Sequence, residues 1–231
     1  EDLILSSRRP RVSGFEAWPA IRTTTDNAEL ARLSDIVMLS VRPEDLEGVE
    51  ADLSGKLVIS VMARVPMTEI TRRFGCDRMV RSMPNASAEQ AQSFTPWHAA
   101  SEVTAGDRAF VADFFGASGV AREVPREADI DYFTGLTGSG VAFPALMARA
   151  MIEHAVENGI SADLADTAVR QLMLGAGTYV SQSSDSAAEI VKTFIDYGGT
   201  TAAGLCAMID RGSDSVVKAG LDAAWKRALG N

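Results

Sequence analysis

The sequence predicts an α/β protein in which a doubly wound, mostly parallel sheet over residues 1–126 is followed by an all-helical segment over residues 127–231. Short strand-like and helix-like segments alternate through the first half, over connections of a few residues. Residues 36–41 and 57–61 are continuous apolar runs, as expected for parallel strands that are buried on both faces. No convincing strand follows Arg126, where long segments of helical period begin.

The elements of the first half have recognisable boundaries. Asp26 or Thr25 is the expected N-cap of a short helix, and Thr104 begins a capping-box pattern. Pro43 and Pro66 open two further helices, because proline is favoured in the first helical turn. The expected strands are 3–5, 36–41, 57–61, 79–81, 94–99 and 121–124, and the expected helices are 28–33, 43–49, 67–74 and 104–115.

The second half reads as a helical bundle. Residues 141–158 are apolar nearly all round and end at Gly159, and Ser161 caps a second long helix. Further helices are expected over 186–194, 200–210 and 213–229. Helices that are apolar on several faces bury more surface than one domain can cover, so the sequence predicts a homodimer or a larger homo-oligomer.

Composition narrows the class of protein. With 22 Lys and Arg against 31 Asp and Glu, the formal net charge is −9, which disfavours nucleic acid and anionic membranes as partners. No signal peptide and no membrane-length apolar run is present, so a cytoplasmic protein is expected. Cys76 and Cys206 match no metal or redox spacing, and we expect both to be buried and no metal to be bound.

Ligands of open parallel sheets bind beyond the carboxyl ends of the strands. The first such end, Ser6-Ser7-Arg8-Arg9, has hydroxyls and arginines where an acid would favour an unphosphorylated dinucleotide. Arginine offers a bidentate fork to phosphate, so this end suits a 2′-phosphate, although a solvated basic loop is the alternative.

Two stretches, 135–140 and 196–205, combine glycines with Ser or Thr at the start of an apolar helical segment. Small residues let a ligand approach the backbone, and N-cap hydroxyls with free amides can hold a carboxylate or phosphate. The pattern therefore predicts an anionic substrate. His98 and His154 are more readily interpreted as structural than as catalytic residues, so a cofactor would carry the chemistry.

These residues resemble the pyrroline-5-carboxylate reductase family along nearly the whole chain. The resemblance is carried by 27–29, Ser40-Val41-Arg42-Pro43, 59–63, Val80-Arg81-Ser82-Met83-Pro84-Asn85, Thr137-Gly138-Ser139-Gly140 and Gly198-Gly199-Thr200-Thr201. It implies a Rossmann-like dinucleotide-binding domain and a helical dimerisation domain. It also implies NADPH-dependent reduction of the cyclic imine 1-pyrroline-5-carboxylate to proline, in a homodimer or larger assembly.

The resemblance also assigns residues. Those that would bind the cofactor are Ser7, Arg8, Arg9, Asn27, Val41, Arg42, Pro43, Ala63 and Asn85. Those that would bind substrate are Asp196, Gly198, Gly199, Thr200 and Thr201, with Thr201 as the catalytic residue.

The chain departs from the family pattern at several positions. Arg64 stands in place of a usual Gly, Val141 in place of Pro, and Asp196-Tyr197 in place of Ser-Pro, and Arg42 replaces a Lys. These changes keep two alternatives open: a reductase of another cyclic imine, and a non-catalytic dimeric relative. The family's first strand, glycine-rich turn and helix, which hold the cofactor pyrophosphate, do not occur in these 231 residues. A protein lacking that segment should bind cofactor poorly, whereas a protein in which it precedes Glu1 should bind it.

Overall fold

The computed structural model describes residues 3–8, 14–15 and 17–230 of the chain. By the density of their contacts, the residues form two compact units, 1–138 together with 225–231, and 139–224. The expected domain boundary between residues 126 and 127 stays a prediction, because compactness alone does not identify the segments that fold independently.

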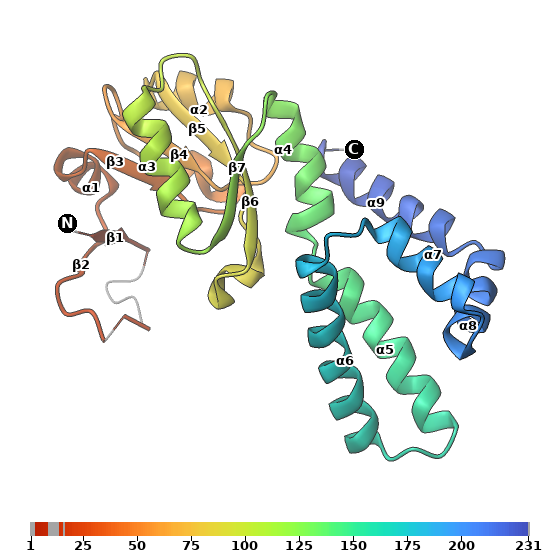
Figure 1. The fold of residues 1–231 in the computed structure, drawn as a ribbon. Coiled ribbons are helices and arrows are strands. Elements are labelled where there is room, and N and C mark those ends of the chain that lie inside the picture. Colours follow the sequence, from red (N-terminus) through yellow and green to blue (C-terminus); the bar gives the residue numbers. More distant parts are fainter. Residues whose placement is uncertain (1–2, 9–13, 16, 231) are drawn as a thin grey trace. The chain divides into compact units, whose positions relative to one another are not determined.

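The first unit contains a five-stranded sheet with strands in the order β3-β4-β5-β6-β7 (Figure 1). All neighbouring strands are parallel except β5 and β6, so the expected mostly parallel sheet is confirmed. The strands are β3 (Ile36–Leu39), β4 (Leu57–Ser60), β5 (Arg78–Ser82), β6 (Ser93–Ala99) and β7 (Gly119–Glu123). The helices of this unit are α1 (Asn27–Leu33), α2 (Met67–Phe74), α3 (Ala105–Gly116) and α4 (Glu127–Phe133), with 3-10 turns at η1 (Pro43–Gly48) and η2 (Ala86–Gln90).

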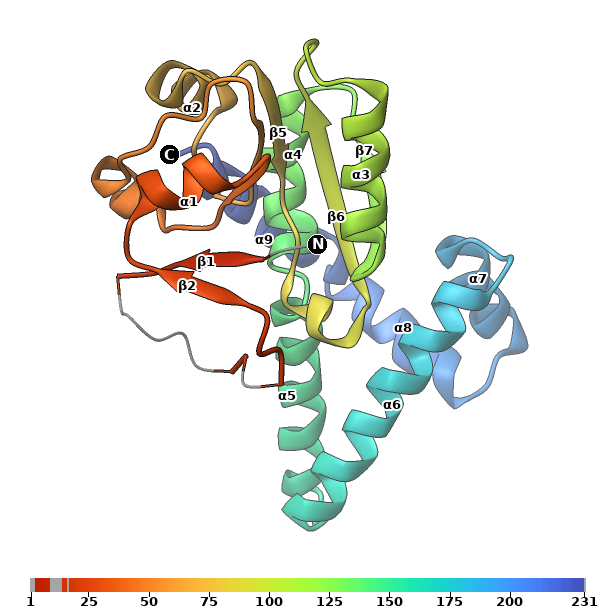
Figure 2. The ribbon, with the colours of Figure 1, turned by 90° about the vertical axis from the view of Figure 1, so that its left-hand side faces the viewer.

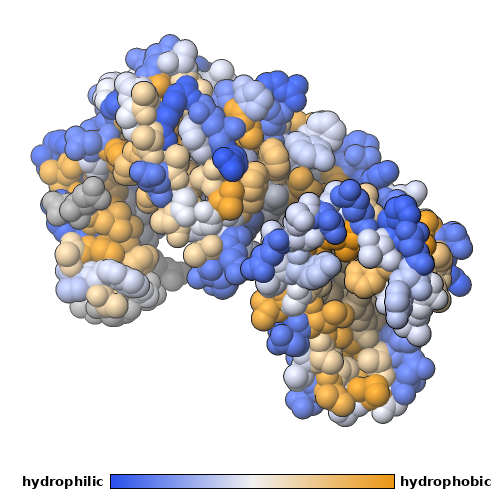
Figure 3. Space-filling model, viewed as in Figure 1, coloured by the Kyte–Doolittle hydropathy of each residue, from blue (hydrophilic) through white to orange (hydrophobic). Residues whose placement is uncertain are grey.

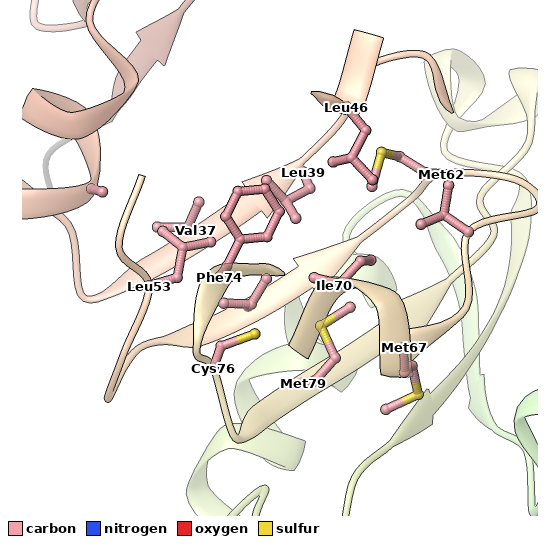
Figure 4. Close-up of a cluster of buried hydrophobic side chains, with 13 residues drawn as sticks. Val37, Leu39, Leu46, Leu53, Met62, Met67, Ile70, Phe74, Cys76 and Met79 are labelled. Atoms are coloured by element: carbon pink, nitrogen blue, oxygen red, sulfur yellow. The ribbon is translucent and has the colours of Figure 1, made fainter. Parts of the chain in front are cut away.

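Strand β4 shows how this sheet is covered on both faces. Because side chains alternate along a strand, Val58 faces one side, whereas Leu57 and Ile59 face the other. Val58 belongs to a cluster with Ile70 and Phe74 of α2, which Figure 4 shows in close-up. Leu57 and Ile59 belong to a second cluster, which includes Val111 and Phe115 of α3. All four residues of β4 are buried, as its continuous apolar sequence predicts.

Three expectations for the first unit need correction. Strand β3 is shorter than 36–41 and only half-buried, because it is the edge of the five-stranded sheet and leaves Ile36 and Met38 exposed. The segment that Pro43 opens is a 3-10 turn rather than an α-helix. Strand β2 (Arg22–Thr24) was not expected from its polar sequence; it pairs in parallel with β1 (Ile4–Ser6) in a separate two-stranded ladder.

The second unit is entirely helical. It comprises α5 (Ala142–Glu157), α6 (Ala162–Gln182), α7 (Ala187–Tyr197), α8 (Thr200–Asp210) and most of α9 (Ser213–Ala228). Helices α5 and α6 run side by side as a hairpin (Figures 1 and 2). The Ser161 side chain caps α6 by accepting from the Leu164 amide, and Gly159 after α5 has a φ of 88°. In the described part of the chain no strand follows Arg126, as expected.

Large apolar side chains lie on the surface of the helical unit. Neither α5 nor α7 contains a buried residue. Figure 3 shows apolar surface over α5 and α6, where Leu146, Met151, Leu164, Leu172, Leu174 and Val180 are exposed. The expectation that Cys206 is buried is wrong for the same reason: it lies on α8, which this chain leaves largely uncovered, whereas Cys76 is buried under the sheet. None of the described helices combines the length and apolarity needed to cross a membrane.

Candidate functional site

The carboxyl ends of β1 and β3 meet at one carboxylate, Asp45. Arg8 Nη1 lies 3.3 Å from Asp45 Oδ1, and Arg42 Nε donates to Asp45 Oδ2 at 2.9 Å. Hydrogen bonding from Arg42, supported by the charges of Arg42 and Arg8, lowers the pKa of Asp45 against the opposing effect of desolvation. The structure thus brings Arg8 and Arg42 together. Asp45 was not expected to be a site residue, although its i,i+3 spacing from Arg42 on a Pro-initiated turn was a signal.

Asn27 is also tied to the end of β1. Ser6 Oγ donates to Asn27 Oδ1 at 2.7 Å, and the Ser7 amide donates to the Thr24 carbonyl at 3.1 Å. Asp26, one of the two expected N-cap residues, caps α1. Its side chain accepts hydrogen bonds from the amides of Ala28 and Glu29. Ser7 and Asn27 are therefore held near each other, whereas Arg9 lies outside the described residues.

The loops after β4 and β5 share a small apolar cluster. Met83 is buried with Val124 and Ile130, and Ala63 and Phe133 pack against them. A Cβ added at Gly138 would lie 3.6 Å from Met83 Cγ, so the glycine allows close packing here. This cluster brings the expected site residue Ala63 to the start of the Met83-Pro84-Asn85 segment.

Asn85 and the partly buried Val41 have structural roles in this arrangement. Asn85 Oδ1 accepts the Ser87 amide at 2.9 Å and caps η2, and the Asn85 amide donates to Ser93 Oγ at 3.1 Å. Val41 packs against the core beneath α2, and Pro43 begins η1. These contacts hold the backbone of the expected cofactor-binding residues at the carboxyl edge of the sheet.

A buried arginine, Arg81, also anchors this region, a role that was not expected from the sequence. The Arg81 side chain is 2% exposed and pairs with Asp131 at 2.5 Å and with Glu127 at 3.2 Å. Glu127 Oε1 also accepts the Met67 amide at 2.8 Å, at the start of α2. One ionic network therefore joins β5, α2 and α4. Arg81 Nε has no hydrogen-bond partner in the described structure.

The 135–140 stretch does not supply the hydroxyl N-cap that was expected for the following helix. Helix α4 continues into a π-helical turn, Thr134–Gly138, a geometry that is frequent at functional sites. Thr137 Oγ1 donates to the Phe133 carbonyl at 3.1 Å. The N-cap of α5 is Val141, which makes no side-chain cap bond, so the Thr137 hydroxyl serves the preceding turn rather than the next helix.

The 196–201 segment joins two helices. Helix α7 runs to Tyr197 and ends at Gly198, whose φ of 72° places it in the left-handed region that favours glycine. Gly199 is the N-cap of α8 and offers no side-chain bond, so the expected hydroxyl cap is wrong, while the free backbone amides remain. Thr201 is exposed in the first turn of α8, and Asp196 is ion-paired with Lys192.

His98 contacts a backbone carbonyl, and His154 contacts the side chain of Asn158 four residues further along the chain. His98 Nδ1 lies 2.9 Å from the Val124 carbonyl oxygen, and Asn158 Nδ2 lies 3.5 Å from His154 Nε2. Among the described residues, no cluster of three or more His, Cys, Asp or Glu side chains could hold a metal ion. The arginines at the sheet edge of the first unit suit the binding of anions. In the second unit, taken by itself, the start of α8 has backbone amides without intrahelical partners.

Two family models match this chain. The model described as pyrroline-5-carboxylate reductase dimerisation matches residues 127–230, and the model described as NADP oxidoreductase, coenzyme F420-dependent, matches residues 3–64. A pyrroline-5-carboxylate reductase of Synechocystis is 32% identical over 90% of this chain and 79% of its own length. That of Methanosarcina acetivorans is 33% identical over 95% of this chain and 80% of its own.

Solved structures agree with these relatives. The 1-pyrroline-5-carboxylate reductase of Streptococcus pyogenes aligns with a TM-score of 0.88 and 27% identity, over 100% of this chain and 90% of that chain. The Plasmodium falciparum pyrroline carboxylate reductase with NADP bound aligns with a TM-score of 0.82 and 25% identity, over 96% and 85% of the two chains. The match confirms the expected Rossmann-like sheet followed by an all-helical dimerisation domain, and the dimerisation model indicates a homo-oligomer.

Proposed function

The chain belongs to the pyrroline-5-carboxylate reductase family, and we propose that it reduces 1-pyrroline-5-carboxylate to proline with a hydride supplied by NADPH. The observation that carries this function is the similarity to reductases of that name along 90–95% of the chain, at 32–33% identity. Transfer of a hydride to a C=N bond requires no strong side-chain base, which agrees with the structural roles of the two histidines.

On the cofactor side, we propose that Ser7, Arg8 and Arg9 bind the 2′-phosphate and that Asn27 contacts the adenosine ribose. The Arg8 side chain is 81% exposed, and its present partner is the carboxylate of Asp45. An exposed ion pair of this kind contributes little to stability, so a phosphate can replace Asp45 as the partner. We further propose that the remaining contacts to the dinucleotide come from Val41, Arg42, Pro43, Ala63 and Asn85.

On the substrate side, we propose that the amides of Gly199 and Thr200, with the Thr201 hydroxyl, hold the substrate carboxylate or ring nitrogen. The Gly198 amide donates to the Ile195 carbonyl at 3.0 Å, so the expected role of Gly198 as a donor to substrate needs correction: it shapes the turn. The N-terminus of α8 supports this role, because its first amides lack intrahelical partners and the helix dipole favours an anion. Thr201 then acts by orienting the imine, and positioning supplies most of the rate. Asp196 lies beside this site, with its charge offset by Lys192.

We propose a homodimer, or an assembly built from homodimers, formed through residues after about 127. The uncovered apolar faces of α5 to α8 support it, and a permanent interface of this type buries more than roughly 2,000 Å². A cytoplasmic location is part of the same proposal and fits the two free cysteines.

The test is a reductase assay on the full-length protein, followed as oxidation of NADPH or NADH with pyrroline-5-carboxylate and with 1-pyrroline, the same ring without the carboxylate. We expect the protein to turn over pyrroline-5-carboxylate and to prefer NADPH to NADH. Arg8→Ala and Arg9→Ala should each weaken NADPH binding by roughly 10-fold or more, since each removes a charge-assisted contact. Arg72→Ala, at an exposed position on α2, is the control.

The assay also separates the alternatives. Faster turnover of 1-pyrroline than of pyrroline-5-carboxylate would favour a reductase of another imine. The departures from the family pattern at Arg64 and Asp196-Tyr197 keep this alternative open. Binding of NADPH without turnover of either imine would favour a non-catalytic relative. Equal affinity for NADPH and NADH would contradict the proposed role of Arg8 and Arg9.

A further inference from the structure

Arg64 has an unusual backbone for its residue type. It follows Ala63 in the loop after β4 and has a φ of 64°, in the left-handed region where a Cβ crowds the neighbouring carbonyl. Ala91, with a φ of 55°, is the other non-glycine residue of the described chain in this region. Strained conformations of this kind persist where the surrounding structure imposes them, and they cluster at ligand sites.

The loop on both sides of Arg64 is held in place. Met62 and Val65 on either side are buried, and the Met62 amide donates to Ser60 Oγ at 3.2 Å. The loop ends at Met67, whose amide is held by Glu127, the partner of Arg81. The loop is thus anchored at both ends, on either side of the left-handed residue.

The Arg64 side chain has no partner within the described structure. It is exposed, and no ion pair or hydrogen bond engages its guanidinium. By contrast, Arg8 and Arg42, at the neighbouring carboxyl ends of β1 and β3, are both paired with Asp45, and Arg42 is also paired with Glu44. At the sheet edge where open parallel sheets bind ligands, Arg64 is thus an arginine whose five donors remain available.

We propose that Arg64 is a specificity-determining residue that binds an anionic oxygen group of a bound reactant. The proposal rests on the proposed function, in which both reactants are anions: the imine has a carboxylate and the cofactor has phosphates. An arginine matches either group with two parallel hydrogen bonds. The strain at φ 64° is retained because the guanidinium is needed at this point of the loop, where glycine would adopt the same backbone without strain.

The experiment compares Arg64→Gln, Arg64→Lys and Arg64→Gly in the full-length protein. Ala91→Gly is the matched control for relief of left-handed strain, and Arg72→Gln is the control for loss of an exposed positive charge. The readouts are KM and kcat with pyrroline-5-carboxylate and with 1-pyrroline, the Kd of NADPH by fluorescence titration, and the Kd of L-proline for the NADP-bound protein. The melting temperature of each variant is measured alongside.

If Arg64 binds the carboxylate, Arg64→Gln should raise KM for pyrroline-5-carboxylate and Kd for proline by about 10- to 100-fold, while 1-pyrroline and NADPH are unaffected. If it binds a cofactor phosphate, the Kd of NADPH should rise by a similar factor and both imines should be affected equally. Arg64→Lys should retain part of the binding. Arg64→Gly should raise the melting temperature, as Ala91→Gly should, yet lose the same binding as Arg64→Gln.

The proposal is overturned if Arg64→Gln changes neither the Kd of NADPH, nor the Kd of proline, nor KM for the carboxylate by more than about twofold, roughly 0.4 kcal/mol. That result would leave the proposed function intact, because the parent protein would still reduce the imine. If the parent protein reduces neither imine, the proposed function is contradicted instead. The Kd values of NADPH and of L-proline for the parent and the Arg64 variants then still decide the role of Arg64.

Discussion

The sheet unit and the helical unit bury their apolar residues in different ways. The sheet has helices on both faces, and alternate residues of β4 enter the two separate clusters beneath α2 and α3. In the helical unit, α5 and α7 bury no residue, and α6 buries only Ala165 and Val169. The first unit therefore has a core of its own, whereas the second has apolar faces that need a further surface to cover them.

The two units also present charge differently. The sheet edge has arginines held by acids from other elements, as in the pairs of Arg8 with Asp45 and of Arg81 with Asp131. The helical unit has ion pairs one turn apart on exposed helices, and its candidate site uses backbone amides at the start of α8. Stability should accordingly depend on side-chain networks in the sheet unit and on assembly in the helical unit.

The largest expected effect follows from this difference in burial. Helices α6 and α7 form an open apolar groove of about 380 Å³, and Leu172 in it is 53% exposed. Leu172→Glu should abolish the homo-oligomer, because a charge in a permanent interface is desolvated without a partner. Light scattering at micromolar concentration measures the mass.

Val120→Glu is the matched control, since Val120 on β7 is also 53% exposed but lies in the sheet unit. It should leave the assembly unchanged. If both variants assemble like the parent, the apolar face of α6 is not an interface.

The next effect concerns ion pairs. Arg81→Met leaves Glu127 and Asp131 without their buried partner and should lower the free energy of unfolding by about 2–4 kcal/mol. Arg170→Met breaks the exposed pair with Asp166 on α6 and should leave stability within error. Urea unfolding of both variants measures the contrast, and equal losses would show that burial does not distinguish the two pairs.

Removal of one hydroxyl at α8 should have a smaller effect, and on rate rather than stability. Thr201→Ala should lower kcat for pyrroline-5-carboxylate by about 10- to 100-fold, because it removes one hydrogen bond that strengthens in the transition state. Thr193→Ala, which removes an exposed hydroxyl from α7, should retain parental kinetics. Unchanged turnover in Thr201→Ala would exclude its hydroxyl from the mechanism.

The smallest expected effect is the loss of stability in acid. It is compared between two capping boxes, that of α3 in the sheet unit and that of α7 in the helical unit. Desolvation raises the pKa of Asp107, but hydrogen bonds from Thr104 and the charge of Arg78 outweigh it, so the pKa is lowered overall. In the helical unit, hydrogen bonds from Ser186 lower the pKa of Glu189. A carboxyl whose pKa is lower in the folded state stabilises above its unfolded pKa, and this stabilisation is lost as the pH falls through the folded value.

Parent protein should therefore lose stability below about pH 4, near the unfolded values of these groups. Asp107→Asn should reduce the dependence of stability on pH more than Glu189→Gln does, because Asp107 is also paired with Arg78 at 3.0 Å. Thermal unfolding at pH 7, 5, 4 and 3 measures both slopes. A steeper acid dependence in Asp107→Asn than in the parent would contradict the sign.

Local sequence patterns predicted most elements because each depends on a few neighbouring residues. Asp26, Thr104 and Ser161 cap the helices that begin after them, and Pro66 precedes α2. The same patterns failed where a neighbour far along the chain decides the outcome. β2 has no apolar alternation and exists through its pairing with β1, and β3 is half-exposed because it lies at the sheet edge.

By itself, the sequence determined most of the strands and helices, the change to an all-helical second half, and the family to which the chain belongs. Only the tertiary structure decided which charges meet: the acids that pair with Arg81 lie 46 and 50 residues further along the chain. Only the tertiary structure, too, placed Arg64 in the left-handed region, since that backbone results from a loop anchored at both ends. Periodicity and caps act within a few residues, whereas ion pairs, strain and burial depend on the path of the whole chain.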